Sequence, residues 1–431
     1  MIKNKSNGKV FRNVLIIFII LLILGCSLYL IYQNKIYNKK QEEDKKREQA
    51  REISSYYHKY VKTNKDRDLY ILSDNNYQKI GEIKENEELE LSPGAISSDT
   101  LYFKIKSLEN TYYISYEDID KIDSLSVVND RYRKYIVYNT NIITKNNTRF
   151  YNEKGDLIYT LYKSYELPII IKDNDRYGVE FNNRLLYIKN DDVLSTVDKE
   201  NSRLEKTDKV RTLLYHRVYD PITEKCVQII CHKEKQFESH MKYLHDNGYF
   251  TLKMDELEKF IDGKIQLPKK SIVITIDDGT MDKRVVPIIE KYKVNATLFL
   301  VTSRFNDNDF NDFASDYLEL HSHTDNMHNA GECNGYGQQG GGILCLPAEK
   351  VIEDLKKSRD RLEESTVFSY PFYDYSKRAI ELLKKSGFTM AFAGAEGTNG
   401  FSYVGTNKLI IPRLTFTSFT TFEEFKSYVK Y

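Results

Sequence analysis

Residues 271–279, which read SIVITIDDG, decide the fold of the C-terminal half of this chain. The first six are almost all apolar, and a short apolar run rich in β-branched residues is typical of a parallel strand buried on both faces. Asp277 and Asp278 follow at once, and Gly279 can turn the chain behind them. Charged groups at the end of a buried strand are costly unless ionic partners meet them. The stretch therefore predicts two carboxylates in one cleft, the alternative being that an aspartate caps a helix after the strand.

Apolar strands alternate with amphipathic helical segments on both sides of this stretch, which is typical of α/β domains with parallel strands. The expected strands are 212–215, 272–276, 296–301, 318–320, 367–370, 390–393 and 410–414. The expected helices are 237–247, 254–262, 348–364 and 377–385, with Ser376 and Thr421 as helix N-caps. This alternation predicts a distorted (β/α) barrel over 210–431, with its chemistry at the carboxyl ends of the strands.

A second group of metal-type side chains follows the expected strand at 318–320. Residues 321–328 read HSHTDNMH, so three of the eight histidines of the chain lie close together. Imidazole nitrogen is a common ligand of zinc and similar ions, and a turn can bring the rings of His323 and His328 to one ion. Because an Asp-Asp pair ends another strand, these residues predict a divalent-metal site.

Together these motifs resemble those of the polysaccharide deacetylases with the NodB-homology domain, carbohydrate esterase family four. The matching stretches are LLYHRV at 213–218, TIDDG at 275–279, SHTDNMH at 322–328, SYPFYDYS at 369–376 and IPRLTF at 411–416. The spacing of His323 and His328 is similar to that of the poly-N-acetylglucosamine deacetylase branch. The resemblance implies removal of N-acetyl groups from an N-acetylhexosamine polymer of the cell envelope, either peptidoglycan or poly-N-acetylglucosamine.

The resemblance also implies a metal centre with a base beside it. Asp278, His323 and His328 would hold a divalent ion, usually Zn²⁺, with Co²⁺ and Mn²⁺ as alternatives. Asp277 would take a proton from the attacking water.

Two further roles follow from the same resemblance. The backbone near Phe372 and Tyr373 would stabilise the oxyanion. The general acid for the leaving amine lies on the first strand in this branch. Since no histidine follows His328, His216 is the remaining candidate for that role.

Three positions depart from the family pattern. Ser369 stands where an arginine that tunes the catalytic aspartate is frequent, and Tyr373 stands where a glycine is frequent. We expect Arg413 to replace that arginine. His321 occupies a position where a small or amide residue is frequent, so it is expected to line the cleft or to compete as a ligand.

Residues 332–348 are rich in glycine and read as an insertion beside the metal-type residues that shapes substrate access. They include Cys333 and Cys345, while Cys226 and Cys231 form a second local pair. Local pairs are what an oxidising compartment cross-links, which favours a Cys333–Cys345 disulfide. The alternative is that these cysteines are buried free thiols.

Residues 13–32 are expected to form a transmembrane helix. The run from Val14 to Tyr32 carries no charge and, at about 1.5 Å per residue, can cross a hydrocarbon core of roughly 30 Å. Basic residues without acids in the tail 1–12 predict a cytoplasmic N-terminus. We therefore expect a single-pass protein of the cell membrane whose catalytic domain is extracytoplasmic.

One alternative concerns the same apolar run, because LILGC at 22–26 resembles a bacterial lipoprotein box with Cys26 as the lipidated residue. After the run, residues 33–67 are highly charged and contain few helix breakers. They are expected to form a solvated helical stalk.

Short alternating strands separated by turn residues follow the stalk and predict small all-β units. A weak repeat is present, because the pattern Tyr-Ile-x-x-(Glu/Asp)-Asp-(Ile/Val) occurs at 113–119 and again at 187–193. The pattern resembles two bacterial SH3-like barrels, at 68–125 and 126–198. Such domains bind wall polymer or act as spacers.

The charge balance excludes one class of partner. Lys and Arg number 64 and Asp and Glu 63, so no global positive field exists to bind nucleic acid. Two functions compete with the N-deacetylase. One is a wall-binding protein with a decayed catalytic domain, and the other is an O-deacetylase on the same scaffold.

Overall fold

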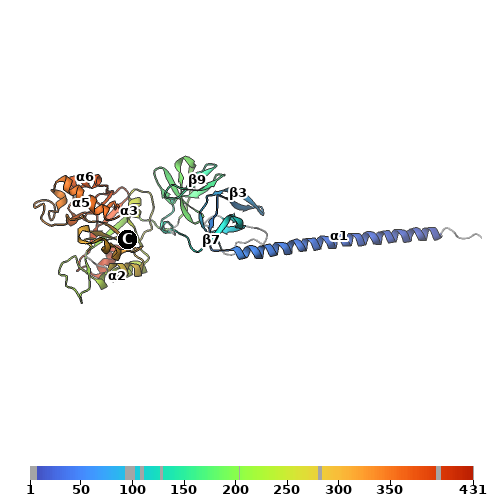
Figure 1. Ribbon diagram of the computed structural model, residues 1–431, viewed down its shortest axis with the longest axis horizontal. Coiled ribbons are helices and arrows are strands. Elements are labelled where there is room, and N and C mark those ends of the chain that lie inside the picture. Colours follow the sequence, from blue (N-terminus) through green and yellow to red (C-terminus); the bar gives the residue numbers. More distant parts are fainter. Residues whose placement is uncertain are drawn as a thin grey trace, which may run out of the picture. The chain divides into compact units, whose positions relative to one another are not determined.

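The computed structural model describes residues 7–92, 102–106, 111–126, 130–202, 204–279, 284–394 and 399–430 (Figure 1). Parts of the expected basic tail and of the first expected barrel, at 1–6, 93–101 and 107–110, lie outside the described residues. The chain divides into two compact units. Unit 1 comprises residues 1–128, 145–165 and 180–187, and unit 2 comprises 129–144, 166–179 and 188–431. The boundary therefore passes several times through the region expected to be one barrel, at 126–198.

The N-terminal part is a single long helix, α1, over Asn7–Tyr56 (Figure 1). Within it, Val14–Glu42 is long and apolar enough to cross a membrane, a test that a signal sequence also passes. The expected helical stalk at 33–67 is too long, since α1 ends at Tyr56 and strand β1 covers Tyr60–Thr63. The alternating burial of β1, with Val61 and Thr63 inside, explains the difference.

Unit 1 is built of antiparallel strands. They are β1, β2 Arg67–Ser73, β3 Asn76–Ile83, β4 Glu88–Glu90, β5 Tyr102–Ile105, β6 Tyr112–Ser115, β7 Ile119–Ile122, β9 Thr148–Tyr151 and β10 Leu157–Leu161. One sheet has the order β4-β1-β7, and the other contains β9-β10-β3-β2-β6-β5. Asp74 and Asn75 both have positive φ, as the tight hairpin between β2 and β3 requires. Aromatic side chains such as Phe103, Phe150 and Tyr159 are buried in its core.

Unit 2 begins with further short strands from the same region. Strand β8, Thr140–Thr144, lies between β11, Glu166–Pro168, and β15, Val193–Asp198. Strand β12, Ile171–Lys172, pairs with β13, Arg176–Phe181, whose last two residues belong to unit 1, and β14, Arg184–Lys189, has only its last two residues in unit 2. These strands confirm the all-β character expected between the N-terminal helix and residue 198.

The main sheet of unit 2 is a mixed half-barrel. Its strands are β16 Lys209–Tyr215, β20 Ser271–Ile276, β21 Ala296–Leu300, β22 Leu318–Ser322, β23 Val367–Ser369, β24 Met390–Phe392 and β25 Phe401–Tyr403, in the order β24-β23-β22-β21-β20-β16-β25. All pair in parallel except β25, which is antiparallel to β16. The short strands β19, Phe250–Thr251, and β26, Leu414–Thr415, pair with β20 and β16.

The segment 411–416 connects the two sides of this sheet. Ile411 bridges to Phe392 of β24, and the backbone N–H of Phe416 donates to the carbonyl oxygen of Leu214 in β16 at 3.0 Å. The strand expected at 410–414 is reduced to β26 because Pro412 has no N–H to donate to a ladder.

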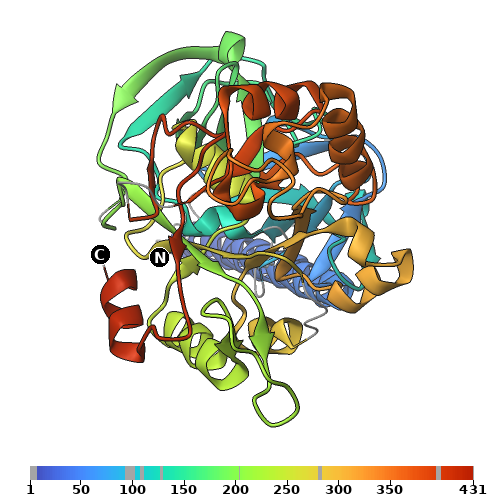
Figure 2. The same ribbon diagram turned by 90° about the vertical axis from the view of Figure 1, so that its left-hand side faces the viewer.

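Helices follow most of these strands. They are α2 Glu234–Asp246, α3 Met254–Ile261, α4 Val285–Tyr292, α5 Ala348–Asp360, α6 Lys377–Lys385 and α7 Phe422–Val429. The four expected helices and the N-caps Ser376 and Thr421 are confirmed, whereas α4 was not expected. Figures 1 and 2 show α5 and α6 side by side. Apolar residues of the inner strands, such as Leu213, Ile274 and Leu298, form the core.

Candidate active site

The carboxyl end of β20 carries the two aspartates. The backbone N–H of Asp277 donates to the carbonyl oxygen of Tyr215 at 3.0 Å, so Asp277 extends the parallel pairing of β20 with β16. The chain then turns sharply, because Asp278 has a φ of 73° and Gly279 a φ of 50°. A Cβ at position 279 would clash with the side chain of Leu300, so the turn needs glycine.

Asp277 forms a buried ion pair with Arg413, from the segment that connects β24 to β16. The guanidinium donates from Nη1 to Oδ1 at 2.7 Å and from Nη2 to Oδ2 at 2.9 Å, and the hydroxyl of Ser369 donates to Oδ2 at 3.0 Å. Both charged groups are almost fully buried. Burial opposes ionisation of Asp277, but the charge of Arg413 outweighs it and lowers the pKa of the carboxyl. Asp277 is therefore ionised at neutral pH.

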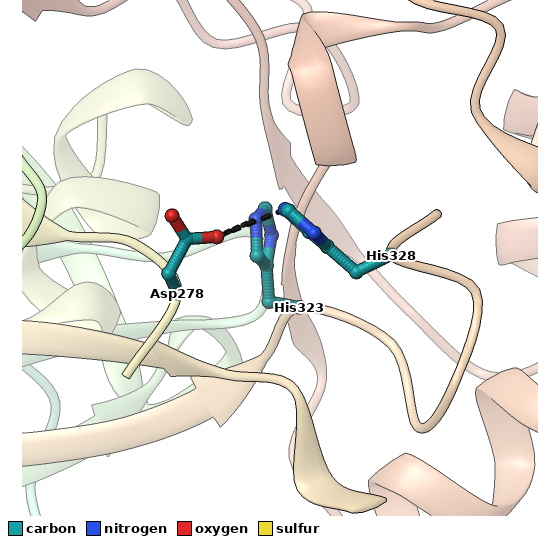
Figure 3. Close-up of side chains that lie close together, drawn as sticks. All are labelled: Asp278, His323 and His328. Carbon is teal, nitrogen blue, oxygen red and sulfur yellow. Dashed lines mark ion pairs between the residues drawn. The ribbon is translucent and has the colours of Figure 1, made fainter. Parts of the chain in front are cut away.

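Asp278, His323 and His328 converge from two loops (Figure 3). Oδ1 of Asp278 lies 2.9 Å from Nε2 of His328 and 3.5 Å from Nε2 of His323, and the potential ligand atoms all lie within 4.8 Å of one another. Burial alone would raise the pKa of the Asp278 carboxyl. The hydrogen bonds and charges of the two histidines outweigh burial and lower that pKa. Two imidazoles and one carboxylate are a donor set that fits a zinc-type cation.

The orientation of His323 is fixed by its second ring nitrogen. Nδ1 lies 2.8 Å from the carbonyl oxygen of Ser369, which can only accept a hydrogen bond. Nδ1 therefore carries a proton, and Nε2 faces Asp278, where it can donate to the carboxylate when the ring is charged and offers its lone pair to a cation when the ring is neutral. Ser369 thus holds two members of the site, Asp277 through its hydroxyl and His323 through its carbonyl oxygen.

The loop between the two histidines is held by a residue that sequence reasoning missed. The carboxylate of Asp354, in α5, accepts hydrogen bonds from the backbone N–H groups of Asp325 at 2.8 Å and Asn326 at 2.7 Å. Asp325 in turn accepts a hydrogen bond from the hydroxyl of Thr302 at 2.7 Å. The signal that marks Asp354 is its place between Val351 and Leu355 on the buried side of an amphipathic helix.

His216 follows β16 and lies at a pocket beside the aspartates. The pocket is lined by His216, Arg217, Ile276, Asp277, Gly279, Val285 and Leu298. Burial lowers the pKa of the His216 imidazole, although the charges of Asp277 and Asp278 act in the opposite direction. Nδ1 of His216 has no hydrogen-bond partner among the residues that the structure describes.

Phe372 and Tyr373 lie in a turn after β23, and both have a positive φ, of 59° and 62°. The ring of Phe372 packs on that of His328, with centroids 4.5 Å apart. The backbone N–H of Tyr373 donates to the carbonyl oxygen of Tyr370 at 3.1 Å, and its hydroxyl lies 3.3 Å from that of Thr415. The turn therefore brings the expected oxyanion residues to the metal-type group, with the N–H of Tyr373 bonded inside the turn.

The structure does not bring His321 into the group of Asp278, His323 and His328. Its Nδ1 hydrogen-bonds with the hydroxyl of Ser365 at 2.7 Å, and burial lowers the pKa of its imidazole to about 4. His321 is a neutral residue of β22 that bonds to a serine and not to the expected ligands.

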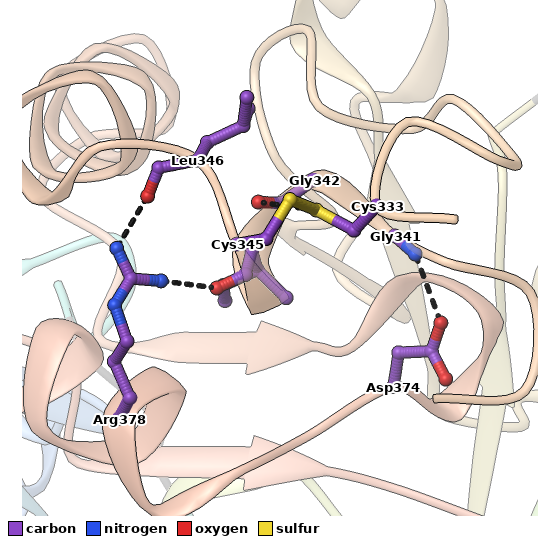
Figure 4. Close-up of a disulfide and its surroundings, with 8 residues drawn as sticks. Cys333, Gly341, Gly342, Cys345, Leu346, Asp374 and Arg378 are labelled. Carbon is purple, nitrogen blue, oxygen red and sulfur yellow. Dashed lines mark hydrogen bonds between the residues drawn. A yellow bond between two sulfur atoms is a disulfide. The ribbon is translucent and has the colours of Figure 1, made fainter. Parts of the chain in front are cut away.

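Both local cysteine pairs form disulfides. Cys333 is joined to Cys345 with their Cα atoms 5.6 Å apart, and Cys226 is joined to Cys231 at 6.2 Å. Figure 4 shows that Asp374 and Arg378 contact the loop closed by the first of these disulfides.

Comparisons with known proteins find similar sequences and structures for the C-terminal part of the chain. Residues 264–391 match the model of the polysaccharide deacetylase family. A solved de-N-acetylase from Aggregatibacter actinomycetemcomitans is 23% identical, with a TM-score of 0.45 over 51% of this chain and 100% of that chain. The putative polysaccharide deacetylase YxkH of Bacillus subtilis (strain 168) is 27% identical over 206 residues, which cover 45% of this chain and 68% of the relative. The poly-β-1,6-N-acetyl-D-glucosamine N-deacetylase of Staphylococcus aureus (strain MRSA252) is 27% identical over 226 residues, 45% of this chain and 73% of the relative. By the family match and these two sequence relatives, the protein carries a polysaccharide deacetylase domain in its C-terminal part.

Proposed function

We propose that this protein is a metal-dependent N-deacetylase that acts on an N-acetylhexosamine polymer of the cell envelope, either peptidoglycan or poly-N-acetylglucosamine. One observation carries the proposal: the ligand atoms of Asp278, His323 and His328 converge beside an ionised, buried Asp277. The Staphylococcus aureus relative is named for a polymer of N-acetylglucosamine, which supports this class of substrate.

In this proposal, Asp278, His323 and His328 hold a divalent cation, which the donor set favours as Zn²⁺, with Co²⁺ and Mn²⁺ as alternatives. Such a cation polarises a carbonyl group and lowers the pKa of water. Asp277, held by Arg413 and Ser369, accepts the proton of the attacking water.

The remaining groups act on the two ends of the scissile amide. The turn of Phe372 and Tyr373 lies against the metal-type group, where backbone dipoles stabilise an oxyanion. His216, which lines the same pocket as the proposed base, donates a proton to the nitrogen that leaves as an amine. The C–N bond breaks, acetate forms with the oxygen of water, and the sugar keeps a free amino group.

We further propose that α1 anchors the protein in the cell membrane, with its N-terminus cytoplasmic and its catalytic domain extracytoplasmic. The apolar window Val14–Glu42 and the basic residues before it support this topology. The antiparallel strands that follow α1 are proposed to form SH3-like modules, consistent with the sequence repeat.

The test measures acetate release by the purified full-length protein with Zn²⁺, Co²⁺ or Mn²⁺. Substrates are poly-N-acetylglucosamine, chito-oligosaccharides, peptidoglycan and an O-acetylated analogue. The variant Asp277→Asn is expected to bind the metal as the wild type does and to lose about 10²-fold or more of its turnover. Asp255→Asn, an exposed acid in α3, is the matched control and keeps full turnover.

Three results would overturn the proposal. Full turnover by Asp277→Asn removes Asp277 from the role of base. Hydrolysis of esters alone shows an O-deacetylase. Binding to cell walls without acetate release from any substrate shows a wall-binding protein with a decayed catalytic domain.

A further inference from the structure

The glycine-rich insertion is closed and held on several sides (Figure 4). The disulfide Cys333–Cys345 joins its ends, and the guanidinium of Arg378 donates to the carbonyl oxygens of Ile343, at 3.0 Å, and Leu346. The side chain of Ile343 is buried in the apolar cluster with α5 and α6. A loop held in this way has little conformational freedom to lose when it binds a ligand.

A single buried carboxylate organises the other side of the insertion. Asp374, 2% exposed, accepts hydrogen bonds from the backbone N–H groups of Gln338, Gln339 at 3.3 Å and Gly341 at 3.0 Å. Gly337 has a φ of 60°, and a Cβ there would clash with Asp374, so the backbone approaches the carboxylate closely. Three charge-assisted hydrogen bonds fix the conformation of the tip.

The same contacts join the insertion to the metal-type residues. Asp374 directly follows Tyr373 in the turn after β23, and the position of a Cβ on Gly341 lies 3.3 Å from the ring of Phe372. Phe372 packs on His328. The insertion is therefore a wall of the proposed cleft, one aromatic ring away from a proposed metal ligand.

The tip of this wall presents an aromatic ring and two amides. Tyr336 is 59% exposed although its backbone N–H is bonded to the carbonyl oxygen of Cys333, and Gln338 and Gln339 are exposed as well. No residue from 334 to 346 is charged. An exposed aromatic face suits the apolar C–H face of a sugar ring, and primary amides both donate to and accept from hydroxyl and acetamide groups.

We propose that Tyr336, Gln338 and Gln339 form a subsite that binds a second, uncharged pyranose ring of the polymer, beside the ring that is deacetylated. This inference rests on the proposed function, because it takes the substrate to be a glycan. The uncharged tip fits an N-acetylhexosamine and not a uronic acid or a phosphate-bearing polymer, which call for cationic side chains. The disulfide and Asp374 hold the subsite ready before the polymer arrives.

The experiment compares Tyr336→Ala and Gln338→Ala/Gln339→Ala with the wild type on substrates of increasing length. The measured quantities are kcat and KM of acetate release by the full-length protein, and the Kd of a hexameric N-acetylglucosamine oligomer for the Asp277→Asn protein. For long oligomers we expect Tyr336→Ala to raise KM and Kd about two- to tenfold with kcat unchanged, the size of one aromatic contact. For the shortest substrate we expect no change.

Two controls separate a lost contact from a disturbed loop. Tyr336→Phe keeps the ring and is expected to keep the wild-type KM. Tyr403→Ala removes a tyrosine that is 45% exposed on β25, opposite Lys209 at the start of β16 and thus at the other end of the sheet, and should change nothing.

The outcomes distinguish this inference from the proposed function. Equal losses on short and long substrates, or an unchanged KM and Kd on long ones, would overturn the subsite while leaving the deacetylase intact. A wild-type protein that deacetylates no glycan overturns the proposed function, and the Kd of the oligomer then decides the subsite alone.

Discussion

At the scale of single residues, the proposed base depends on a partner that is remote in sequence. A carboxylate as buried as Asp277 would take up a proton unless a cation met it. Both terminal nitrogens of the Arg413 guanidinium donate to the carboxylate of Asp277, and the hydroxyl of Ser369 adds a third hydrogen bond. The site therefore keeps an ionised acid that is almost fully buried.

Removing Arg413 should shift the pH dependence of the reaction. In the proposed mechanism Asp277 acts as a base only when it is ionised, and Arg413 lowers the pKa of its carboxyl group. In Arg413→Ala that pKa rises, so the acid limb of kcat/KM against pH moves to higher pH. Loss of a buried partner also lowers the free energy of unfolding by about 3–5 kcal/mol. The pH–rate profile and urea denaturation of the full-length protein measure both effects.

Two neighbours of this variant act as controls. Arg413→Lys keeps the positive charge, so its acid limb should move less than that of Arg413→Ala. Ser369→Ala removes one neutral donor, so it too should move the acid limb less than Arg413→Ala does. An acid limb that stays in place in Arg413→Ala would contradict the assignment of Asp277 as the base.

Sequence reasoning reached most of these residues but not all. Asp277, Asp278, His323 and His328 stand out because acids and histidines cluster at strand ends. Arg413 was accessible only through the family pattern, as the replacement of an absent arginine. Asp354 carries no motif, since it acts through backbone N–H groups, and only its place on the buried side of α5 distinguishes it from the exposed acids of that helix.

At the scale of elements, β22 and α3 meet at a carboxyl group with an unusual pKa. Glu319 of β22 accepts a hydrogen bond from the backbone N–H of Met254, at the start of α3, at 2.9 Å. Burial raises its pKa to about 7, with the charge of Asp255 acting in the same direction. The folded protein therefore holds a proton here that the unfolded chain releases near pH 4.5.

This difference predicts a loss of stability as the pH rises. Between about 4.5 and 7 the folded state binds more protons than the unfolded state, so the free energy of unfolding falls through that window. Glu319→Gln keeps a neutral side chain and should remove this part of the slope. Above pH 7 it should be more stable than the wild type by an amount on the order of 1–3 kcal/mol.

Urea denaturation of the full-length protein at pH 5 and pH 8 measures the effect. Glu353→Gln, an exposed acid in α5, is the control and should follow the wild type. If the free energy of unfolding of Glu319→Gln falls between pH 5 and pH 8 as steeply as that of the wild type, the raised pKa of Glu319 is not the cause of the fall.

The spacing of apolar residues along the sequence predicted most of the helices and strands of the C-terminal half, although not all of them. The expected helix at 254–262 and strand at 272–276 agree with α3 and β20 to within a residue. Helix α4 was not expected, although Pro287 lies in its first turn, where a proline is compatible with a helix. The polar outer face of β1 resembles a solvated helix in the sequence, so the expected stalk extends past the end of α1.

At the scale of the whole molecule, the catalytic sheet shares its compact unit with residues well before 210. The guanidinium of Arg131 donates to Glu256 of α3 from Nε at 2.8 Å and from Nη2 at 2.5 Å, and the hydroxyl of Tyr135 donates to the same carboxylate at 3.0 Å. Glu256 is 2% exposed. No local sequence pattern joins positions 125 residues apart, so this contact could not be predicted from the sequence.

Arg131→Ala should therefore destabilise unit 2, although it lies far from the catalytic residues in sequence. It leaves a buried charge at Glu256 with one partner fewer, which costs about 3–5 kcal/mol in the free energy of unfolding. Thermal unfolding of the full-length protein measures the loss. Lys134→Ala, an exposed residue of the same turn, is the control and should unfold as the wild type does.

A double variant tests the cause. Adding Glu256→Gln to Arg131→Ala removes the unpaired charge and should restore part of the lost stability. The contrary outcome is that the losses in the free energy of unfolding caused by Arg131→Ala and by Glu256→Gln simply add in the double variant. Arg131 and Glu256 would then not act as a pair.

The connection made by residues 411–416 also sets an order of events during synthesis. Both aspartates, both histidines and every strand up to β25 leave the ribosome before Arg413 does. Until then, the carboxylate of Asp277 has no guanidinium to neutralise it, and the two sides of the half-barrel are not joined. A nascent chain halted by a premature stop codon ahead of Arg413 would carry all the proposed cation-binding side chains and still lack a working base. The proposed hydrolysis would therefore depend on a residue that is translated after every proposed metal ligand.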